Sequence, residues 1–416
     1  MTTKEFMINH KQHSDCIDAD QQFQVFQEEM AKGLKGETSS LPMIPTYLAP
    51  TSQMRVNEKK ILLDAGGTNF RSAVGWFDED GQAEIRHLSK SGMLTERVSK
   101  EAFYDYIAKQ IVPLAEEGGD IGYCFSYNVA MDNTIDGTLV AMSKELDNEA
   151  LIGSKVGAET LKALSKYNSA PRKICILNDT VATLMGGMAY HIDEIYSSKL
   201  GFIFGTGTNI CYVEKTNKIG KLTDGKTEEM IVNCETANYN KLPQGDFDKI
   251  VMANTADPTR SPLEKMTSGK YLADLAFEVL FAASREGLFT GITNIQPFET
   301  RDISDFLMDS NNKLYRMFKK TADRTIAKEL LNCIIDRSAK VSAISLAAIA
   351  MYGHDGSSNP VAIVCEGTTF HRLTGYKTRL CDYLDEIFAK HNVSYKLIQD
   401  GQELNLVGSL LATFSL

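Results

Sequence analysis

Positive charge and long apolar runs are both scarce in this sequence of 416 residues. Its 44 lysines and arginines face 54 aspartates and glutamates, which gives a formal net charge of −10. Nucleic acids and anionic membranes bind basic surfaces, so this balance disfavours both as partners. The longest apolar run, 341–352, contains serines and is too short to span a bilayer, which indicates a buried helix.

The sequence also lacks paired cysteines. None of its eight cysteines forms a C-x-x-C pair, and Cys124, Cys175 and Cys211 lie within apolar runs, which is typical of reduced core cysteines. The opening MTTKEFMINHKQHSD has no apolar stretch resembling a signal peptide. We therefore expect a cytoplasmic protein. Its length favours two domains of about 150–200 residues each.

Short apolar strands alternate with helical segments from residue 60 onward, after a polar stretch, 1–16, that is predicted to be frayed. This alternation predicts an α/β fold with mixed sheets. The predicted strands are 61–64, 70–77, 83–88, 121–126, 173–177, 200–204, 210–214, 361–365 and 394–398. Helices are predicted near 20–35, 99–114, 154–167, 263–284, 313–332, 335–352 and 374–390.

The first chemically suggestive segment is Asp64-Ala65-Gly66-Gly67-Thr68-Asn69, which lies between two strands. Its small residues let backbone amides face an anion closely, and Arg71 adds a cation. Asp64 can hold Mg²⁺ through water. The spacing fits neither a P-loop nor the dinucleotide fingerprint. An ordinary glycine-containing β-turn remains the alternative for this segment.

A second segment, Gly205-Thr206-Gly207-Thr208-Asn209, repeats the theme between two further strands. The tripeptide Gly-Thr-Asn at 67–69 recurs at 207–209. Two similar hairpins suggest two halves built on one plan, with the turns forming a clamp for a polyphosphate. Two unrelated tight turns are the alternative.

Asn178 and Asp179 directly follow the predicted strand 173–177 and begin a helix. A carboxylate fixed at that point can act as a general base toward a sugar hydroxyl that attacks the γ-phosphorus of ATP. Both residue types are also good helix N-caps. Position alone leaves these two interpretations of Asp179 open.

These segments together resemble the eukaryotic-type hexokinases. The stretch 61–71 resembles the first phosphate motif of that family, ILNDTVATLM (176–185) its catalytic segment, and IFGTGTNICYVE (203–214) its second phosphate motif. PLEKMTSGKYLADL (262–275) and SYKLIQDG (394–401) also match, so the resemblance covers roughly 20–416 in consistent order. It implies a two-lobed, actin-like (ribonuclease H-like) hexokinase fold.

The resemblance also implies roles for individual residues. Asp179 would be the general base, and Lys144 would bind the sugar and offset charge on the transferred phosphoryl group. The implied sugar-binding residues are Ser126, Ser143, Lys144, Asn178, Asp179, Asn209, Glu235 and Glu264. Those implied for ATP and its phosphates are Asp64, which would also serve Mg²⁺, Gly66, Gly67, Thr68, Asn69, Arg71, Gly205, Thr206, Gly207, Thr208, Gly367, Thr368 and Gly408.

Several positions depart from the family pattern. Tyr127 follows Ser126, where the family's serine lies before a proline, and the run 236–239 replaces a tryptophan-glycine run after Glu235. Ser261 stands where a glutamine is expected near the sugar. The late glycine-rich stretch is reduced to Gly408-Ser409. These departures bear on sugar identity and nucleotide preference.

The implied reaction is transfer of the γ-phosphoryl group of Mg-ATP to the 6-hydroxyl of a hexose such as glucose. The expected small lobe is 60–180 plus 401–416, and the expected large lobe is 17–59 plus 181–400, with the sugar in a cleft that closes to exclude water. The alternatives are a non-catalytic sugar sensor on the same fold and a kinase of a different sugar or other acceptor. The bacterial repressor-type sugar kinases usually carry a cysteine-histidine zinc cluster, which this sequence lacks.

Overall fold

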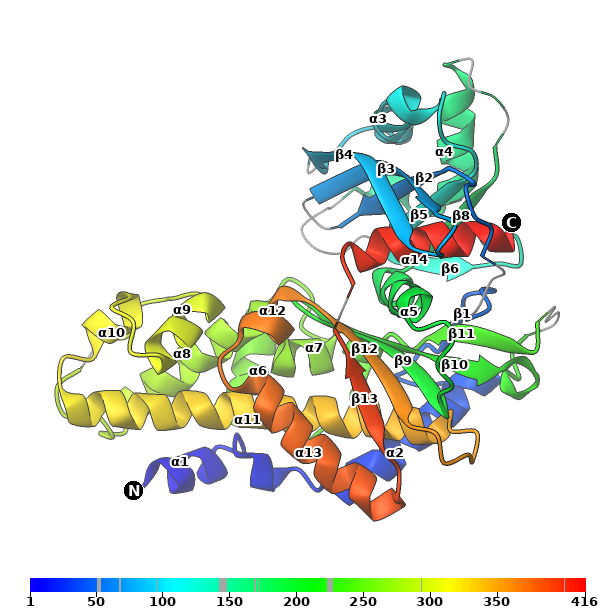
Figure 1. Ribbon diagram of the computed structural model, residues 1–416. Coiled ribbons are helices and arrows are strands. Elements are labelled where there is room, and N and C mark those ends of the chain that lie inside the picture. Colours follow the sequence, from blue (N-terminus) through cyan, green and yellow to red (C-terminus); the bar gives the residue numbers. More distant parts are fainter. Residues whose placement is uncertain are drawn as a thin grey trace. The chain divides into compact units, whose positions relative to one another are not determined.

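The structure is a computed structural model that describes all residues except 51–53, 67–68, 95, 142–147, 168–169, 171, 223–226, 293 and 400. Figure 1 shows two principal sheets with flanking helices. By compactness the chain divides into two units. Unit 1 comprises 1–42, 202–210 and 234–396, and unit 2 comprises 43–201, 211–233 and 397–416. The lobes predicted from the sequence remain a prediction.

Unit 2 contains a five-stranded mixed sheet with the order β4-β3-β2-β5-β8. Its first three strands along the chain pair antiparallel, whereas β2, β5 and β8 run parallel. Every residue of β2, β5 and β8 is buried, as expected for parallel strands covered on both faces. The strands are β2 (Lys60–Ala65), β3 (Asn69–Phe77), β4 (Ala83–Gly92), β5 (Ile121–Phe125) and β8 (Ile174–Leu177).

Helices cover the two faces of this sheet, as Figure 1 shows. On one face, strand residues such as Ile61, Tyr123 and Ile176 join a core with α3 and α4. On the other face, a Cβ added at Gly122 would lie 2.1 Å from the Ser409 carbonyl oxygen of α14, and α14 packs closely on α5. The helices are α3 (Lys100–Ile111), α4 (Val156–Ser165), α5 (Asp179–Tyr190) and α14 (Leu404–Ala412), and a hairpin is formed by β6 (Asn128–Met131) and β7 (Gly137–Ala141).

The second sheet has the order β1-β11-β10-β9-β12-β13. If β1 is left out and the strands of each sheet are counted along the chain, both sheets have the same spatial order: third, second, first, fourth, fifth. This shared order supports the predicted common plan of the two halves. The strands are β1 (Ile44–Pro45), β9 (Ser198–Phe204), β10 (Thr208–Lys215), β11 (Glu229–Asn233), β12 (Val361–Glu366) and β13 (Tyr395–Ile398).

The prediction that residues 1–16 are frayed is wrong, because Thr3–Asn9 form a capped helix, α1. The side chains of Thr2 and Glu5 form a capping box, and Phe6 and Met7 are fully buried. Helix α1 is in contact with α11 (Thr321–Tyr352), so tertiary packing orders a segment whose composition is polar. The early helices are α1 (Thr3–Asn9) and α2 (Ala19–Lys35).

Two predicted helix boundaries in unit 1 are also wrong. The predicted helix 263–284 is interrupted at Ser268, which has extended backbone angles. The predicted helices 313–332 and 335–352 are not separated at 333–334, because α11 runs without a break through these residues. A short α10 instead precedes α11. The helices are α6 (Asp246–Ala253), α7 (Pro262–Thr267), α8 (Gly269–Arg285), α9 (Thr300–Leu307), α10 (Lys313–Met317), α11 (Thr321–Tyr352), α12 (Thr368–Arg372) and α13 (Tyr376–His391).

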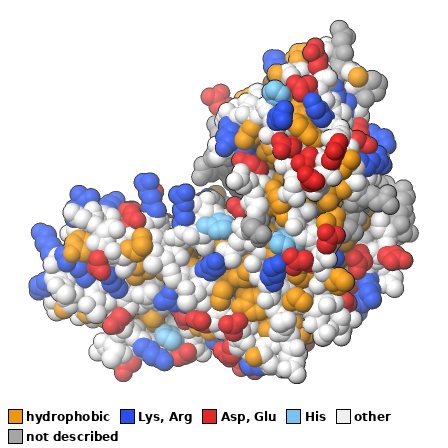
Figure 2. Space-filling model, in the orientation of Figure 1, with side chains coloured by type: hydrophobic (Ala, Val, Ile, Leu, Met, Phe, Trp, Pro, Cys, Tyr) orange, Lys and Arg blue, Asp and Glu red, His pale blue; other side chains and the backbone are white. Residues whose placement is uncertain are grey.

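None of the helices in the described ranges is long and apolar enough to cross a membrane. On the face shown in Figure 2, basic side chains are interspersed with acidic ones. Among the described residues, Lys328 forms an ion pair with Asp309, and Lys390 forms one with Asp20.

Candidate functional site

Three parallel strand ends bring predicted site residues together in unit 2. Asp64 of β2 is in register with Cys124 of β5, and Cys124 is in register with Leu177 of β8. The residues at and just beyond these ends are Asp64, Ser126, Asn178 and Asp179, which we call the strand-end group. Carboxyl ends of parallel strands are where α/β sheets place their ligands.

The thiol of Cys124 is fully buried and is influenced by both carboxylates of this group. Burial, with the added negative charges of Asp64 and Asp179, raises the pKa of the Cys124 thiol well above its ordinary value. The thiol therefore stays protonated and uncharged. The charges of both carboxylates therefore act on the same buried thiol.

Asn178, and not Asp179, is the N-cap of α5. Its backbone is extended, and its Oδ1 accepts a hydrogen bond of 2.9 Å from the amide of Thr180. Asp179 is the first residue of the helix, and its Oδ1 also accepts from Thr180 at 2.9 Å. The role of Asp179 as a general base remains a prediction.

The β2–β3 hairpin carries the first predicted phosphate segment. The amide of Gly66 donates to the carbonyl of Asn69 at 2.9 Å, which closes the turn. Gly67 and Thr68, predicted to bind phosphate, lie outside the described residues. Asp64 and Arg71 are directly paired across the two strands. The turn is therefore a tight hairpin whose arms bear opposite charges.

Arg71 is more fully engaged than the sequence suggested. Its Nε donates to Asp64 Oδ2 at 2.9 Å, and its Nη atoms form ion pairs with Asp64 and Glu403. Burial alone would lower the pKa of the guanidinium, but the charges of Asp64 and Glu403 outweigh it and raise that pKa. Arg71 is thus a permanent cation held by two carboxylates. No local sequence pattern indicates Glu403 as a partner of Arg71.

Tyr127 links the end of β5 to this hairpin. The amide of Ser126 donates to the carbonyl of Ala65 at 3.1 Å, and the Tyr127 hydroxyl donates to the carbonyl of Gly66 at 3.0 Å. The Tyr127 side chain is buried, and burial raises the pKa of its hydroxyl. It is therefore a neutral donor at any physiological pH. One of the departures from the family pattern thus contacts the predicted phosphate segment directly.

In unit 1, the turn between β9 and β10 rests on the N-terminus of α8. The carbonyl of Gly205 accepts from the Gly269 amide at 2.9 Å, and the carbonyl of Thr206 accepts from the Lys270 amide at 3.1 Å. The Ser268 hydroxyl adds a hydrogen bond of 2.9 Å to Thr206. The break at Ser268 therefore starts a helix whose first amides hold the second predicted phosphate segment.

The N-terminus of α12 packs against the same turn. Gly367 has a φ of +124°, and a Cβ there would lie 2.3 Å from the carbonyl oxygen of Phe204, so only glycine fits. The Thr369 hydroxyl donates to the Gly205 carbonyl at 2.8 Å. Thr368 is the first residue of α12. Gly367 and Thr368, which the family resemblance implies for ATP binding, thus neighbour the turn 205–208.

Glu264 of α7 reaches the same turn. Its Oε2 accepts from the Thr208 amide at 3.2 Å. A Cβ added at Gly207 would lie only 2.3 Å from that oxygen, so the glycine makes room for the carboxylate. A predicted sugar-binding residue and predicted phosphate-binding residues are therefore in contact.

Asn209 organises the neighbouring backbone. Its Oδ1 accepts from the amides of Ile210 at 2.8 Å and Thr236 at 3.1 Å. Glu235, directly before Thr236, has left-handed backbone angles with a φ of +54°. Left-handed non-glycine residues are strained and cluster at functional sites. We call 205–209 with Glu235, Glu264, Gly367 and Thr368 the hairpin group.

The last three predicted residues are Ser143, Lys144 and Gly408. Ser143 and Lys144 lie outside the described part of the chain. Gly408 is buried within α14, where a Cβ would lie 1.9 Å from the carbonyl oxygen of Ala182 in α5. Close packing of the two helices accounts for this glycine, and its predicted contact with phosphate remains untested.

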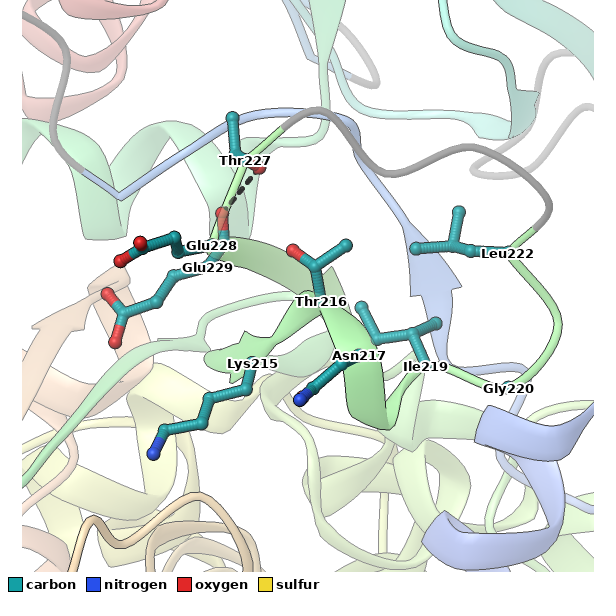
Figure 3. A pocket seen from close by; sticks show the side chains of 9 residues that line it. All are labelled: Lys215, Thr216, Asn217, Ile219, Gly220, Leu222, Thr227, Glu228 and Glu229. Atoms are coloured by element: carbon teal, nitrogen blue, oxygen red, sulfur yellow. Dashed lines mark hydrogen bonds between the residues drawn. The ribbon is translucent and has the colours of Figure 1, made fainter.

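A cavity of about 800 Å³ opens elsewhere in unit 2, at the connection from β10 to β11. Figure 3 shows the side chains that line it, among them Lys215, Glu228 and Glu229. None of the predicted site residues contributes to its lining. This cavity therefore adds nothing to either group.

Comparisons with known proteins agree with these observations. Two sequence profiles, both described as hexokinase, match residues 5–189 and 199–412. Hexokinase-1 of Schizosaccharomyces pombe is 28% identical over 428 residues, covering 93% of this chain and 85% of its own length. Hexokinase-7 of Oryza sativa subsp. japonica is also 28% identical, covering 90% of this chain and 89% of its own length.

A solved structure has the same fold. The hexokinase of Schistosoma mansoni complexed with glucose superposes with a TM-score of 0.81 at 20% identity, and the match covers 100% of both chains. The predicted two-domain α/β fold, with mixed sheets flanked by helices, is confirmed.

Proposed function

The chain belongs to the eukaryotic-type hexokinase family and is a hexokinase-type phosphotransferase, and on this premise we propose that it transfers the γ-phosphoryl group of Mg-ATP to the 6-hydroxyl of a hexose such as glucose, with Asp179 as the general base. The observation that carries this proposal is the strand-end group. It brings Asp179 to the start of α5 with Asn178 as the cap, beside the hairpin that bears Asp64 and Arg71.

Asp179 would accept the proton of the attacking hydroxyl. The hydrogen bond of Asp179 with the Thr180 amide fixes the orientation of the carboxylate. General-base action by a positioned carboxylate typically contributes about 10²–10⁴-fold to the rate.

The two glycine turns would hold the nucleotide's phosphates. Gly66 in one turn, and Gly205 and Gly207 in the other, have no side chain, so an anion can approach the backbone closely there. Nucleotide-bound Mg²⁺ would neutralise charge on the phosphoryl group during transfer. No set of three or more His, Cys, Asp or Glu side chains within the described ranges could hold a metal ion. Asp64 fits a Mg²⁺ that takes most of its ligands from phosphates and water.

The sugar would be read by amides and carboxylates. Asn178, Asn209, Glu235 and Glu264 supply both donors and acceptors, which suit a ring of hydroxyl groups. Ser126, Ser143 and Lys144 belong to the same proposal. The Schistosoma mansoni relative is complexed with glucose, which supports a hexose as the acceptor. We propose a cytoplasmic location with these small-molecule partners.

A panel of sugars incubated with Mg-ATP tests this proposal. ADP release with glucose, mannose or fructose, and ³¹P–¹H correlation that places the new phosphate on carbon 6, is the expected result. Phosphorylation of a different acceptor, such as glycerol or acetate, in preference to every hexose would overturn the substrate assignment. A phosphate on another hydroxyl would overturn the assigned position.

A further inference from the structure

Glu403 is an unusual residue at the start of α14. It has left-handed backbone angles, with φ +53° and ψ +42°, where glycine or asparagine is the common choice. As the N-cap residue it makes no side-chain cap hydrogen bond. Its carboxylate instead forms an ion pair with Arg71 of β3. Helix capping therefore does not explain this glutamate.

Glu403 completes a row of three charges that carries one net negative charge. Arg71 lies between Asp64 and Glu403, and the three side chains are 23%, 8% and 28% exposed, respectively. Because the row is only partly open to solvent, its charges are weakly screened. Asp64 alone would balance the guanidinium, so Glu403 is the surplus charge.

We propose that Glu403 is a positioning residue that restrains Arg71 and thereby weakens the binding of the nucleotide's phosphates at the β2–β3 hairpin. The inference rests on the proposed function, in which this hairpin binds phosphate. Phosphate oxygens compete with carboxylates for the forked donors of a guanidinium. An arginine already held on both sides offers fewer donors, and the surplus carboxylate repels the polyanion.

The ion pair between Glu403 and Arg71 would lower the affinity for the nucleotide and leave the affinity for the sugar unchanged. Glu403 lies at the start of α14 and Arg71 lies in β3. Neither is among the residues proposed to bind the sugar. A change of charge at Glu403 should therefore alter ATP affinity selectively. A purely structural role would alter nucleotide and sugar binding together, through loss of folded protein.

The test uses the full chain and the substitution Glu403→Gln, which keeps side-chain length and hydrogen bonding but removes the charge. Glu159→Gln is the matched control, because Glu159 is 23% exposed and pairs with Lys100 at 2.9 Å in the same unit. Calorimetry with a non-hydrolysable Mg-ATP analogue gives the dissociation constant, and steady-state kinetics gives KM for ATP and for the sugar. Melting temperatures check that the variants fold.

Glu403→Gln should bind the analogue about fivefold or more tightly than wild type, as expected for removing one nearby like charge, with sugar KM within about twofold. Glu159→Gln should match wild type. Glu403→Gly, which suits the left-handed backbone, should also bind more tightly and keeps the test valid if the glutamine variant is unstable. Equal or weaker nucleotide binding in folded variants overturns the inference alone. A wild-type protein that binds no nucleotide overturns the proposed function.

Discussion

Replacing Gly207 by alanine tests how the hairpin group is built. The new Cβ would lie 2.3 Å from Glu264 Oε2, whereas ordinary contacts begin at 3.4 Å, so the two groups must separate by about 1 Å. The end of a flexible side chain moves more easily than backbone. We therefore expect Glu264 to swing away and the turn to keep its shape.

The expected effect on stability is modest, while the effect on function is large. Overpacking and the weakened hydrogen bond from the Thr208 amide to Glu264 together cost about 1–3 kcal/mol. A misplacement of about 1 Å in a substrate-positioning residue can cost about 10²-fold. Gly207→Ala should therefore fold, and should lose about 10–100-fold in kcat/KM for the sugar.

Calorimetric sugar binding, kcat/KM for the sugar and urea unfolding measure these effects. Gly205→Ala is the matched control in the same turn, because its Cβ would meet only Gly367 and Thr368, at 3.8 and 3.9 Å. Its sugar affinity should stay within about twofold of wild type. Unchanged sugar binding in Gly207→Ala, or equal losses in both variants, would refute the contact between Glu264 and the turn as a functional one.

Two further variants probe a hydroxyl and a carboxylate. Tyr127→Phe removes the hydroxyl that donates to Gly66 and should raise the KM for ATP about three- to tenfold. The control Tyr104→Phe loses a buried hydroxyl bonded to Ser154 and should leave the KM for ATP unchanged. Equal KM values in both variants would exclude a role for Tyr127 in positioning. Burial alone would raise the pKa of Glu29, but hydrogen bonds from Ser40 and Lys32 outweigh it and lower the pKa to about 2. The ionised carboxylate therefore contributes fully to the stability of the folded protein above about pH 4.5. This contribution is lost as the pH falls through about 2. In urea unfolding, Glu29→Gln should cost about 2–3 kcal/mol at pH 7 and progressively less below pH 4.5, while the exposed Glu28→Gln should cost almost nothing; a pH-independent cost would contradict this.

The sequence alone predicted the fold class and the main strands. Apolar strand runs and the two glycine hairpins are local signals, so they survive without knowledge of the partners. The same holds for Asn178 and Asp179, because a helix start after a strand can be identified from neighbouring residues. The role of each hairpin in binding remains a prediction.

Features that depend on distant contacts were not predictable. The break at Ser268 contains no proline, and it forms where α8 meets the turn 205–208. The α1 helix is ordered by packing on α11. Glu403 is remote from Arg71 in sequence, and nothing in its neighbourhood indicates a partner. Such contacts arise from tertiary structure, which overrides local propensity.

The turnover of Asp179→Ala tests the central claim most directly. With the preferred hexose and saturating Mg-ATP, its kcat should fall at least about 10³-fold while calorimetric sugar binding persists, because the variant lacks only the general base. Asp193→Asn, which alters an exposed aspartate just beyond α5, should retain wild-type turnover. Near-normal turnover in a folded Asp179→Ala variant would contradict the account.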